Sequence, residues 1–269
     1  MAKNAYIGVS NVARKVKQPY IGVSNVARKV KNGFIGVNNV SRQFFSGGTP
    51  ISSLAVGTSV YLNESGTAKE YIIVNQGIPS NSSLYDSTCN GTWLLRKIGD
   101  ADFQQVWYSR NRNTYANSDV HTWLNSTMLS RYDASVQNLI KQVLIPYGPG
   151  NQSLTVNSGA NGLSCKLFLL SAYEVGFTDL GQYVPVEGAA LSYFNGADDS
   201  KRIFIYSGNG AKTLWWLRTP LETSNKRVSC VYTNGTYKAY DSELSYYARP
   251  ALILPFETLI DENMNIIAT

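Results

Sequence analysis

The sequence predicts an α+β domain with short antiparallel sheets and two to three helices, preceded by an N-terminal β-type repeat arm. Three observations lead to this prediction. The first 46 residues repeat one short pattern of apolar and basic residues. The middle of the chain carries helix caps followed by apolar residues at helical spacing. On either side, short runs of β-branched and aromatic residues alternate with turn residues, which is typical of strands.

The arm contains three copies of a 14-residue unit. The segment from Tyr6 to Lys17 recurs unchanged from Tyr20, and a variant of it begins at Phe34. Each copy has the pattern of two short strands joined by a polar turn. Because so short a unit cannot bury an apolar face alone, we expect the units to stack on one another or on a partner chain. A flexible basic leader is the alternative.

A glycine-rich break follows the third copy. Gly47, Gly48 and Pro50 end the repeat pattern and mark a boundary. We therefore divide the chain into an attachment or oligomerisation arm at residues 1–46 and a domain at residues 47–269.

Charge is concentrated in the arm. Residues 1–45 hold eight of the 24 basic residues and none of the 18 acidic residues, so the remainder is close to neutral. A basic arm can bind nucleic acid or an acidic protein surface. Because no basic pattern interleaved with aromatic residues follows, we expect a structural-protein partner and no nucleic acid.

The first strands of the domain are expected at residues 56–62 and 69–75, around a turn at Glu64-Ser65-Gly66, and at 92–97 and 105–108. A helix follows, which Ser118 or Asp119 can cap. Its histidine, His121, is expected to be a packing residue, since no nucleophile or carboxylate lies at a recognisable spacing.

Two further helices are expected. Asp133 can cap the first of them, whose apolar face ends before Pro146 and consists of Val136, Leu139, Ile140 and Val143. A short helix should begin at Ser171, which forms a capping-box pattern with Glu174 and follows a buried-strand candidate at 166–170.

The C-terminal part returns to strands, expected at 202–206, 214–218, 227–232, 236–240 and 251–254. Asn234-Gly235 suits both positions of a type I′ turn. Residues 227–240 are therefore the clearest hairpin in the chain.

Several classes of protein are excluded by composition. One histidine rules out multi-histidine zinc sites, and Cys89, Cys165 and Cys230 are too scattered for a disulfide framework or a CxxC pair. Asp198-Asp199 is too small a cluster for calcium, so we expect a solvated turn. We expect no enzyme, no cofactor and no metal. No secretory signal follows Met1 and no long apolar run occurs, which predicts synthesis in a bacterial host cytoplasm, with no signal peptide and no membrane span.

Four motifs in this order carry a family resemblance: residues 117–125, 169–176, 215–220 and 248–252. Over about residues 50–256 they resemble a domain of gut-bacterial and prophage proteins. That domain looks like the C-type-lectin-like fold of the formylglycine-generating-enzyme type, which is also used by the variable proteins of diversity-generating retroelements. The resemblance implies a diversified stretch between the last two motifs, here Leu221 to Tyr247.

The composition of residues 221–247 suits a binding surface, because Tyr offers a large amphipathic face and Ser, Asn and Asp offer adaptable hydrogen bonds. The candidate ligand-binding residues are Asn225, Arg227, Ser229, Tyr232, Asn234, Tyr237, Tyr240, Asp241, Glu243, Tyr246 and Tyr247. The flanking motifs should anchor this stretch by packing and hydrogen bonding through Trp215, Trp216, Arg218, Arg249 and Pro250. The tyrosines have an alternative role as ordinary strand residues at the edge of a core.

These features predict a phage tail-tip or fibre protein that binds a host-surface protein or glycan. Residues 1–46 would attach it to a phage structural protein in the virion, and a homotrimer would raise avidity. The alternatives are a relative of the formylglycine-generating oxidases, against which the scattered cysteines argue, and a bacterial surface adhesin.

Overall fold

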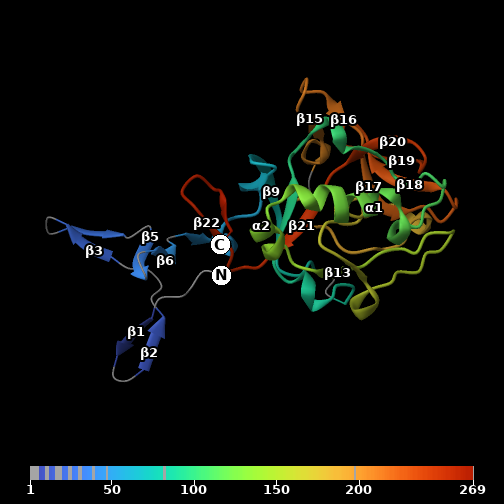
Figure 1. Ribbon diagram of the computed structural model, residues 1–269. Helices are drawn as coiled ribbons and strands as arrows, with labels where there is room; N and C mark the ends of the chain where they lie inside the picture. Colours follow the sequence, from blue (N-terminus) through green and yellow to red (C-terminus); the bar gives the residue numbers. More distant parts are fainter. Residues whose placement is uncertain are drawn as a thin grey trace.

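The computed structural model describes residues 6–9, 12–15, 20–23, 26–29, 32–37, 40–46, 48–80, 83–196 and 198–268, and for the strands before residue 47 it describes the backbone. Each repeat unit forms one antiparallel hairpin. The hairpins pair β1 (Tyr6–Val9) with β2 (Val12–Lys15), β3 (Tyr20–Val23) with β4 (Val26–Lys29), and β5 (Asn32–Val37) with β6 (Val40–Ser46). Within the described residues these hairpins are three separate two-stranded sheets, drawn in blue at one side of Figure 1. The expectation that the units are β-type is confirmed.

A four-stranded antiparallel sheet forms one half of the domain, in the order β21-β10-β9-β8. Its strands are β8 (Ser59–Glu64), β9 (Thr67–Gln76), β10 (Thr92–Arg96) and β21 (Ala251–Leu254). Ser65 and Gly66, with φ of 51° and 80°, join β8 to β9 in the expected turn, and both have the positive φ of a type I′ turn. All residues of β10 and β21 are buried, so the sheet centre lies in the core.

A five-stranded mixed sheet forms the other half, in the order β12-β20-β17-β18-β19. Its strands are β12 (Gln104–Val106), β17 (Trp215–Pro220), β18 (Arg227–Val231), β19 (Tyr237–Asp241) and β20 (Ser245–Ala248). Only β17 and β20 are parallel among the pairs of this sheet (Figure 1). The β18–β19 hairpin confirms the predicted hairpin. Residues 245–248, which lie outside the expected strands, form a strand because they pair with both β12 and β17.

The turn of the β18–β19 hairpin differs from the expected type I′. Gly235 has φ of 91°, but Asn234 is not among the residues with positive φ. The Asn234 side chain accepts hydrogen bonds from the backbone N–H and the hydroxyl of Thr236, at 3.2 and 2.7 Å. A longer loop with one left-handed glycine therefore replaces the two-residue turn, because Asn234 caps the loop with its side chain.

The two α-helices lie in the middle of the described domain. Helix α1 (Asp119–Trp123) begins after Ser118, whose hydroxyl accepts the His121 N–H at 3.2 Å, and the helical run continues to Arg131. Helix α2 (Ala134–Leu139) begins after Asp133 at the expected position, but the Asp133 side chain makes no capping hydrogen bond, and the helix ends before Ile140. Val143, predicted on its apolar face, lies in β13 (Val143–Ile145), because that segment pairs with β14 (Leu163–Cys165).

The prediction of a third helix, beginning at Ser171, is wrong. The capping box is present, with Ser171 N–H donating to Glu174 Oε2 at 2.9 Å and Glu174 N–H donating to Ser171 Oγ at 3.1 Å. The chain nevertheless makes only a turn, since Gly176 has φ of 84° and stops the helix within one turn. The preceding segment, 166–170, is buried but contributes a single bridge between Phe168 and Ala251 rather than a strand.

Two three-stranded sheets and short helical turns complete the described fold. β11 (Ile98–Gly99), β15 (Phe204–Tyr206) and β16 (Lys212–Thr213) form one sheet, and β7 (Thr49–Pro50), β22 (Leu259–Ile260) and β23 (Ile266–Ile267) form the other. Single 3₁₀ turns occupy Ile51–Ser53, Ser87–Cys89, Ala101–Phe103, Tyr115–Asn117, Gly159–Asn161, Gly181–Tyr183 and Asp199–Arg202. The architecture is thus α+β and mostly β. No helix in the described ranges is both long and apolar enough to cross a membrane.

Candidate functional site

The expected anchors lie in the core, on either side of the hairpin. Trp215 and Trp216 are completely buried, and their indole N–H groups donate to the carbonyls of Arg202 and Gln105 at 2.9 and 3.0 Å. Strand β17 is buried along its whole length. The chain therefore enters the 221–247 stretch from a fixed strand.

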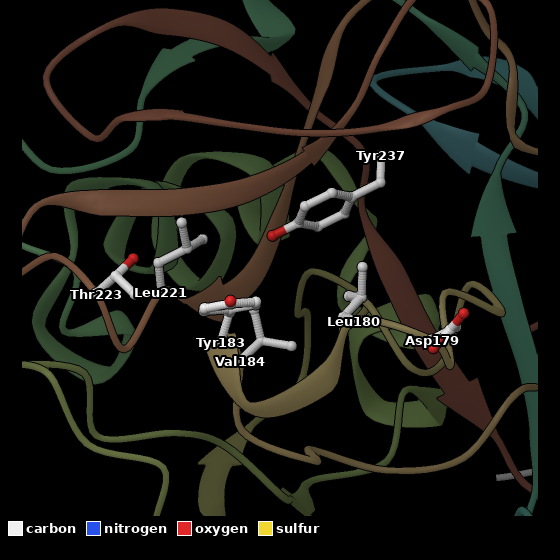
Figure 2. Close-up of a pocket in the computed structure, with 7 residues that line it drawn as sticks. All are labelled: Asp179, Leu180, Tyr183, Val184, Leu221, Thr223 and Tyr237. Atoms are coloured by element: carbon white, nitrogen blue, oxygen red, sulfur yellow. The ribbon is translucent and has the colours of Figure 1, made fainter.

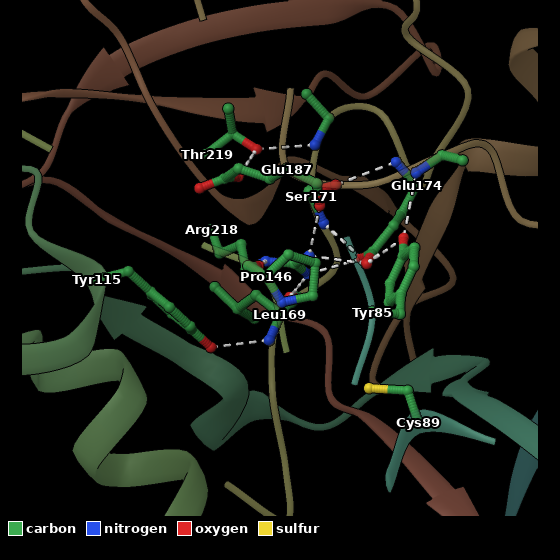
Figure 3. Close-up of polar contacts among 12 residues, drawn as sticks. Tyr85, Cys89, Tyr115, Pro146, Leu169, Ser171, Glu174, Glu187, Arg218 and Thr219 are labelled. Carbon is green, nitrogen blue, oxygen red and sulfur yellow. Dashed lines mark hydrogen bonds and ion pairs between the residues drawn. The ribbon is translucent and has the colours of Figure 1, made fainter. Parts of the chain in front are cut away.

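Arg218 is the centre of a buried polar network (Figure 3). Its guanidinium binds Glu174 with two contacts, at 2.6 and 2.7 Å, and Tyr85 donates to the same carboxylate at 3.0 Å. Three carbonyls accept the remaining N–H groups at 2.8–3.0 Å, those of Pro146, Leu169 and Glu187. Burial alone would lower the pKa of Arg218, but the Glu174 carboxylate outweighs it and raises that pKa. This residue ties four segments to β17.

Glu187 is a second buried carboxyl group in the network. It accepts hydrogen bonds from the Gly148 N–H and the Thr219 hydroxyl, and the Thr219 oxygen accepts the Ala172 N–H at 2.9 Å. Burial raises the pKa of Glu187 to about 7, against the opposing effect of the Arg218 charge. The group therefore titrates close to neutral pH.

Arg249, at the other end of the stretch, is buried without a carboxylate partner among the described residues. Its Nε donates to the Arg96 carbonyl at 2.8 Å, and its guanidinium lies 4.9 Å from the ring centres of both Phe204 and Trp215. Burial lowers the pKa of Arg249 to about 9. The next residue, Pro250, is also buried, and its carbonyl accepts the Arg96 N–H at 2.9 Å.

The register of the five-stranded sheet divides the candidate residues between two faces. Trp216 pairs with Cys230, and Cys230 pairs with Lys238, so these three side chains lie on one face of the sheet, here called the Trp216 face. Tyr240, two residues after Lys238, and Tyr246, two residues before the Trp216 partner Ala248, lie on the same face. Trp215 pairs with Val231, which pairs with Tyr237, and this defines the Trp215 face. The other candidates on the Trp215 face are Arg227, Ser229, Asp241 and Tyr247. The structure thus does not bring all predicted ligand residues together on one surface.

An aromatic patch, defined as Tyr232, Tyr240 and Tyr246, lies on and beside the Trp216 face. The Tyr246 ring packs on Trp216 with a centroid distance of 5.0 Å, and Tyr240 lies 5.3 Å from Tyr246. Tyr232 follows β18 and is 37% exposed. Burial, with smaller effects of Tyr240, Cys230 and Tyr232, raises the pKa of Tyr246. The patch presents aromatic surface on a buried tryptophan floor.

A pocket of about 540 Å³ lies beside the Trp215 face (Figure 2). Leu221, Thr223 and Tyr237 come from the predicted variable stretch, while Asp179, Leu180, Tyr183 and Val184 come from the turn-rich segment before it. The Glu222 N–H donates to the Tyr183 carbonyl at 2.9 Å and joins the two walls. Phe177 packs edge-on against Tyr237 with a centroid distance of 5.6 Å. No sequence pattern predicted the 179–184 wall, because its residues follow no strand or helix period.

The remaining candidates differ in exposure. Asn225, Arg227, Asn234 and Glu243 are exposed, whereas Asp241 is half-buried and pairs with Lys226 at 2.8 Å. Ser229 is completely buried and shares a 3.1 Å hydrogen bond with Tyr237. Tyr247 packs between Phe204 and Tyr206. A direct ligand contact by Ser229 would therefore require movement of Tyr237.

Other reactive side chains have packing or capping contacts. His121 packs against Tyr115 at 5.0 Å, and burial lowers its pKa to about 4. Asp198 and Asp199 are exposed at the start of a 3₁₀ turn, as expected; Asp198 accepts the Ser200 N–H at 2.9 Å, and Asp199 pairs with Arg202 at 2.9 Å. Over the described residues, no group of His, Cys, Asp and Glu side chains is arranged to hold a metal ion.

Comparison with known proteins gives one match. The family described as a domain of unknown function (DUF6273) matches residues 90–256, and the chain belongs to that family. No curated protein and no solved structure gives a significant match. The matched range includes the aromatic patch, the pocket and the network around Arg218 apart from Tyr85.

Proposed function

We propose that this member of the DUF6273 family is a ligand-binding protein displayed on a phage particle. Its domain would bind a host-surface protein or glycan through residues 221–247 and the walls around them. Residues 1–46 would attach it to a phage structural protein, and the fold would be C-type-lectin-like. The observation that carries the proposal is the aromatic patch on a rigid sheet.

Physical chemistry supports binding at this patch. Partly exposed tyrosines supply large contact area at a low cost in side-chain entropy, and a fixed backbone reduces the cost of ordering a loop. Tyr246 rests on a tryptophan that is itself hydrogen-bonded to the backbone. The patch is therefore pre-organised for contact with a partner.

Diversification of residues 221–247 is part of the same proposal. Pro220 before the stretch and Ala248 after it are both buried, so the stretch starts and ends in the core. Side chains such as Asn225, Tyr232 and Glu243 lie between these ends with exposed surface. Their replacement should leave the anchors unchanged.

The alternative of a thiol-dependent oxidase is disfavoured by the cysteines. Cys89, Cys165 and Cys230 are buried, and burial raises the pKa of all three thiols, that of Cys89 to about 12. A reactive thiol needs an accessible, easily formed thiolate. These thiols have neither property.

Binding to cells tests the proposal. Fluorescently labelled full-length protein would be incubated with a panel of gut bacterial isolates, and the cells that retain it would be identified by flow cytometry. The double variant Tyr240→Ala/Tyr246→Ala should lose at least about tenfold in retention, as expected for hot-spot aromatic residues. Tyr61→Ala, in the other large sheet, is the matched control and should bind normally. Equal retention by both variants would refute the role of the patch.

Diversification has its own test in the genome. We expect a reverse-transcriptase gene near this gene and an adenine-rich near-copy of the 221–247 coding stretch. If tail genes are present but such a copy is not, the proposal of receptor binding stands and the proposal of diversification is refuted.

A further inference from the structure

We propose that the pocket beside the Trp215 face accepts an alkylammonium group, supplied by a lysine side chain of the target protein. This inference rests on the proposed ligand-binding function and names the chemistry of one of its contacts. It concerns the pocket lined by Asp179, Leu180, Tyr183, Val184, Leu221, Thr223 and Tyr237 (Figure 2).

The shape and lining of the pocket suit a slender apolar stem. Its volume of about 540 Å³ lies within the usual range for ligand pockets. Leu180, Val184 and Leu221 supply aliphatic surface, and Figure 2 shows the Tyr237 ring over the same space. Four methylenes of a lysine side chain would replace water on these surfaces.

Aromatic rings and one carboxylate favour a positive charge at the end of that stem. Tyr183 is 56% exposed, and with Tyr237 it offers ring faces that attract a cation. Among the described residues, Asp179 is the only charged residue of the lining, and an anionic ligand would meet no cation from these residues there.

Asp179 is also available for a new partner. Within the part of the chain that the structure describes, its carboxylate has no ion pair or hydrogen bond, and it is exposed. Two arginines near Tyr237 already have carboxylate partners. Arg202 pairs with Asp199 at 2.9 Å and stacks 4.5 Å from the Phe177 ring centre, and Arg227 lies 3.6 Å from Asp241. A ligand ammonium would therefore offer Asp179 an ion pair that it lacks among the described residues.

Three small probes separate the contribution of the ammonium charge from that of the aliphatic stem. Full-length protein would be titrated by ligand-observed NMR with Nα-acetyl-lysine methylamide, with its Nε-acetylated form, and with Nα-acetyl-norleucine methylamide. The lysine probe should bind about fivefold more tightly than either uncharged probe, as expected for one exposed cation–π contact and one exposed ion pair. This preference should shrink as salt is raised.

Two variants test whether Asp179 is the source of the preference for the lysine probe. Asp179→Asn should remove the lysine preference and leave the thermal stability unchanged, since Asp179 has no partner to lose among the described residues. Glu257→Gln removes one exposed carboxylate outside the pocket and should retain the full preference. Equal binding of all three probes, or a preference that survives Asp179→Asn, would overturn the inference.

Different results would refute the proposed binding function and the proposed lysine pocket. If Tyr240→Ala/Tyr246→Ala loses cell binding while the three probes bind equally, the pocket assignment is refuted and the binding function stands. If the lysine preference is present but the tyrosine variant retains cell binding, the proposed role of the aromatic patch is refuted and the pocket assignment stands.

Discussion

Strands β17 and β19 lie two positions apart in one sheet and differ in exposure. Every residue of β17, from Trp215 to Pro220, is buried. In β19 none is buried, and Lys238 is exposed. The difference arises because β17 has a neighbouring strand on each side and core on both faces, whereas β19 is an edge strand. A single sheet thus contains a strand whose side chains are committed to folding and another whose side chains are available for contact.

The largest expected effect is at Arg218. Arg218→Ala leaves the Glu174 carboxylate buried without its cation, and we expect the free energy of unfolding to fall by about 3–5 kcal/mol. Urea denaturation measures the change. Arg218→Ala/Glu174→Ala should cost less than the sum of the two single variants, because the pair acts as a unit. A loss below about 1 kcal/mol for Arg218→Ala would show that β17 is not fixed by this network.

A pH effect at Glu187 comes next. Its folded pKa of about 7 exceeds the ordinary glutamate value of 4.5, so the folded state binds the proton more tightly. The free energy of unfolding should therefore fall as pH rises from about 4.5 to about 7, by about 3 kcal/mol in total. In Glu187→Gln that contribution should be missing. The difference between the two proteins, measured by urea denaturation across this range, isolates Glu187 from His121; a constant difference would contradict the prediction.

A substitution in the turn of the β18–β19 hairpin should have a smaller effect on stability. Gly235 has φ of 91°, and a Cβ there would clash with the Asp199 carbonyl oxygen. We expect Gly235→Ala to cost about 1–3 kcal/mol, since both strain and a backbone shift are required. Gly210→Ala is the matched control, because Gly210 also has positive φ, of 72°, but open space around it. Equal melting temperatures for the two variants would show that the close approach of Asp199 does not add to the cost of Gly235→Ala.

The smallest effects are expected in the aromatic patch. Tyr240→Ala and Tyr246→Ala should each cost about 1 kcal/mol or less, the value of an aromatic pair contact. Lys238→Ala, on the same face, should change stability by less than about 0.5 kcal/mol. A loss of several kcal/mol at either tyrosine, seen by thermal denaturation, would place that ring in the core and end the contrast with β17.

The sequence predicted the local elements that carry their own turn or cap. The β8–β9 hairpin follows from Ser65-Gly66, the β18–β19 hairpin from Asn234-Gly235, and the start of α1 from Ser118. It failed where long-range pairing decides. Residues 245–248 form a strand only because β12 and β17 lie on either side, and Val143 joins a strand because β14 is available.

The candidate site shows the same division. Sequence composition singled out Tyr237, Tyr240 and Tyr246, but only the register placed Tyr237 on one face and the other two on the opposite face. The pocket wall at 179–184 could not be predicted, because a segment without periodicity acquires its place from what it packs against.

The sequence by itself determined the repeat arm, the two clearest hairpins and the residues that cap α1, because turn and cap preferences act over a few neighbouring residues. The tertiary structure alone decided that Arg218 meets Glu174 and that Arg249 meets no carboxylate among the described residues. It also decided which tyrosines surround the pocket. These outcomes depend on contacts between residues far apart in the chain, and no local pattern encodes which distant side chain will occupy a given space.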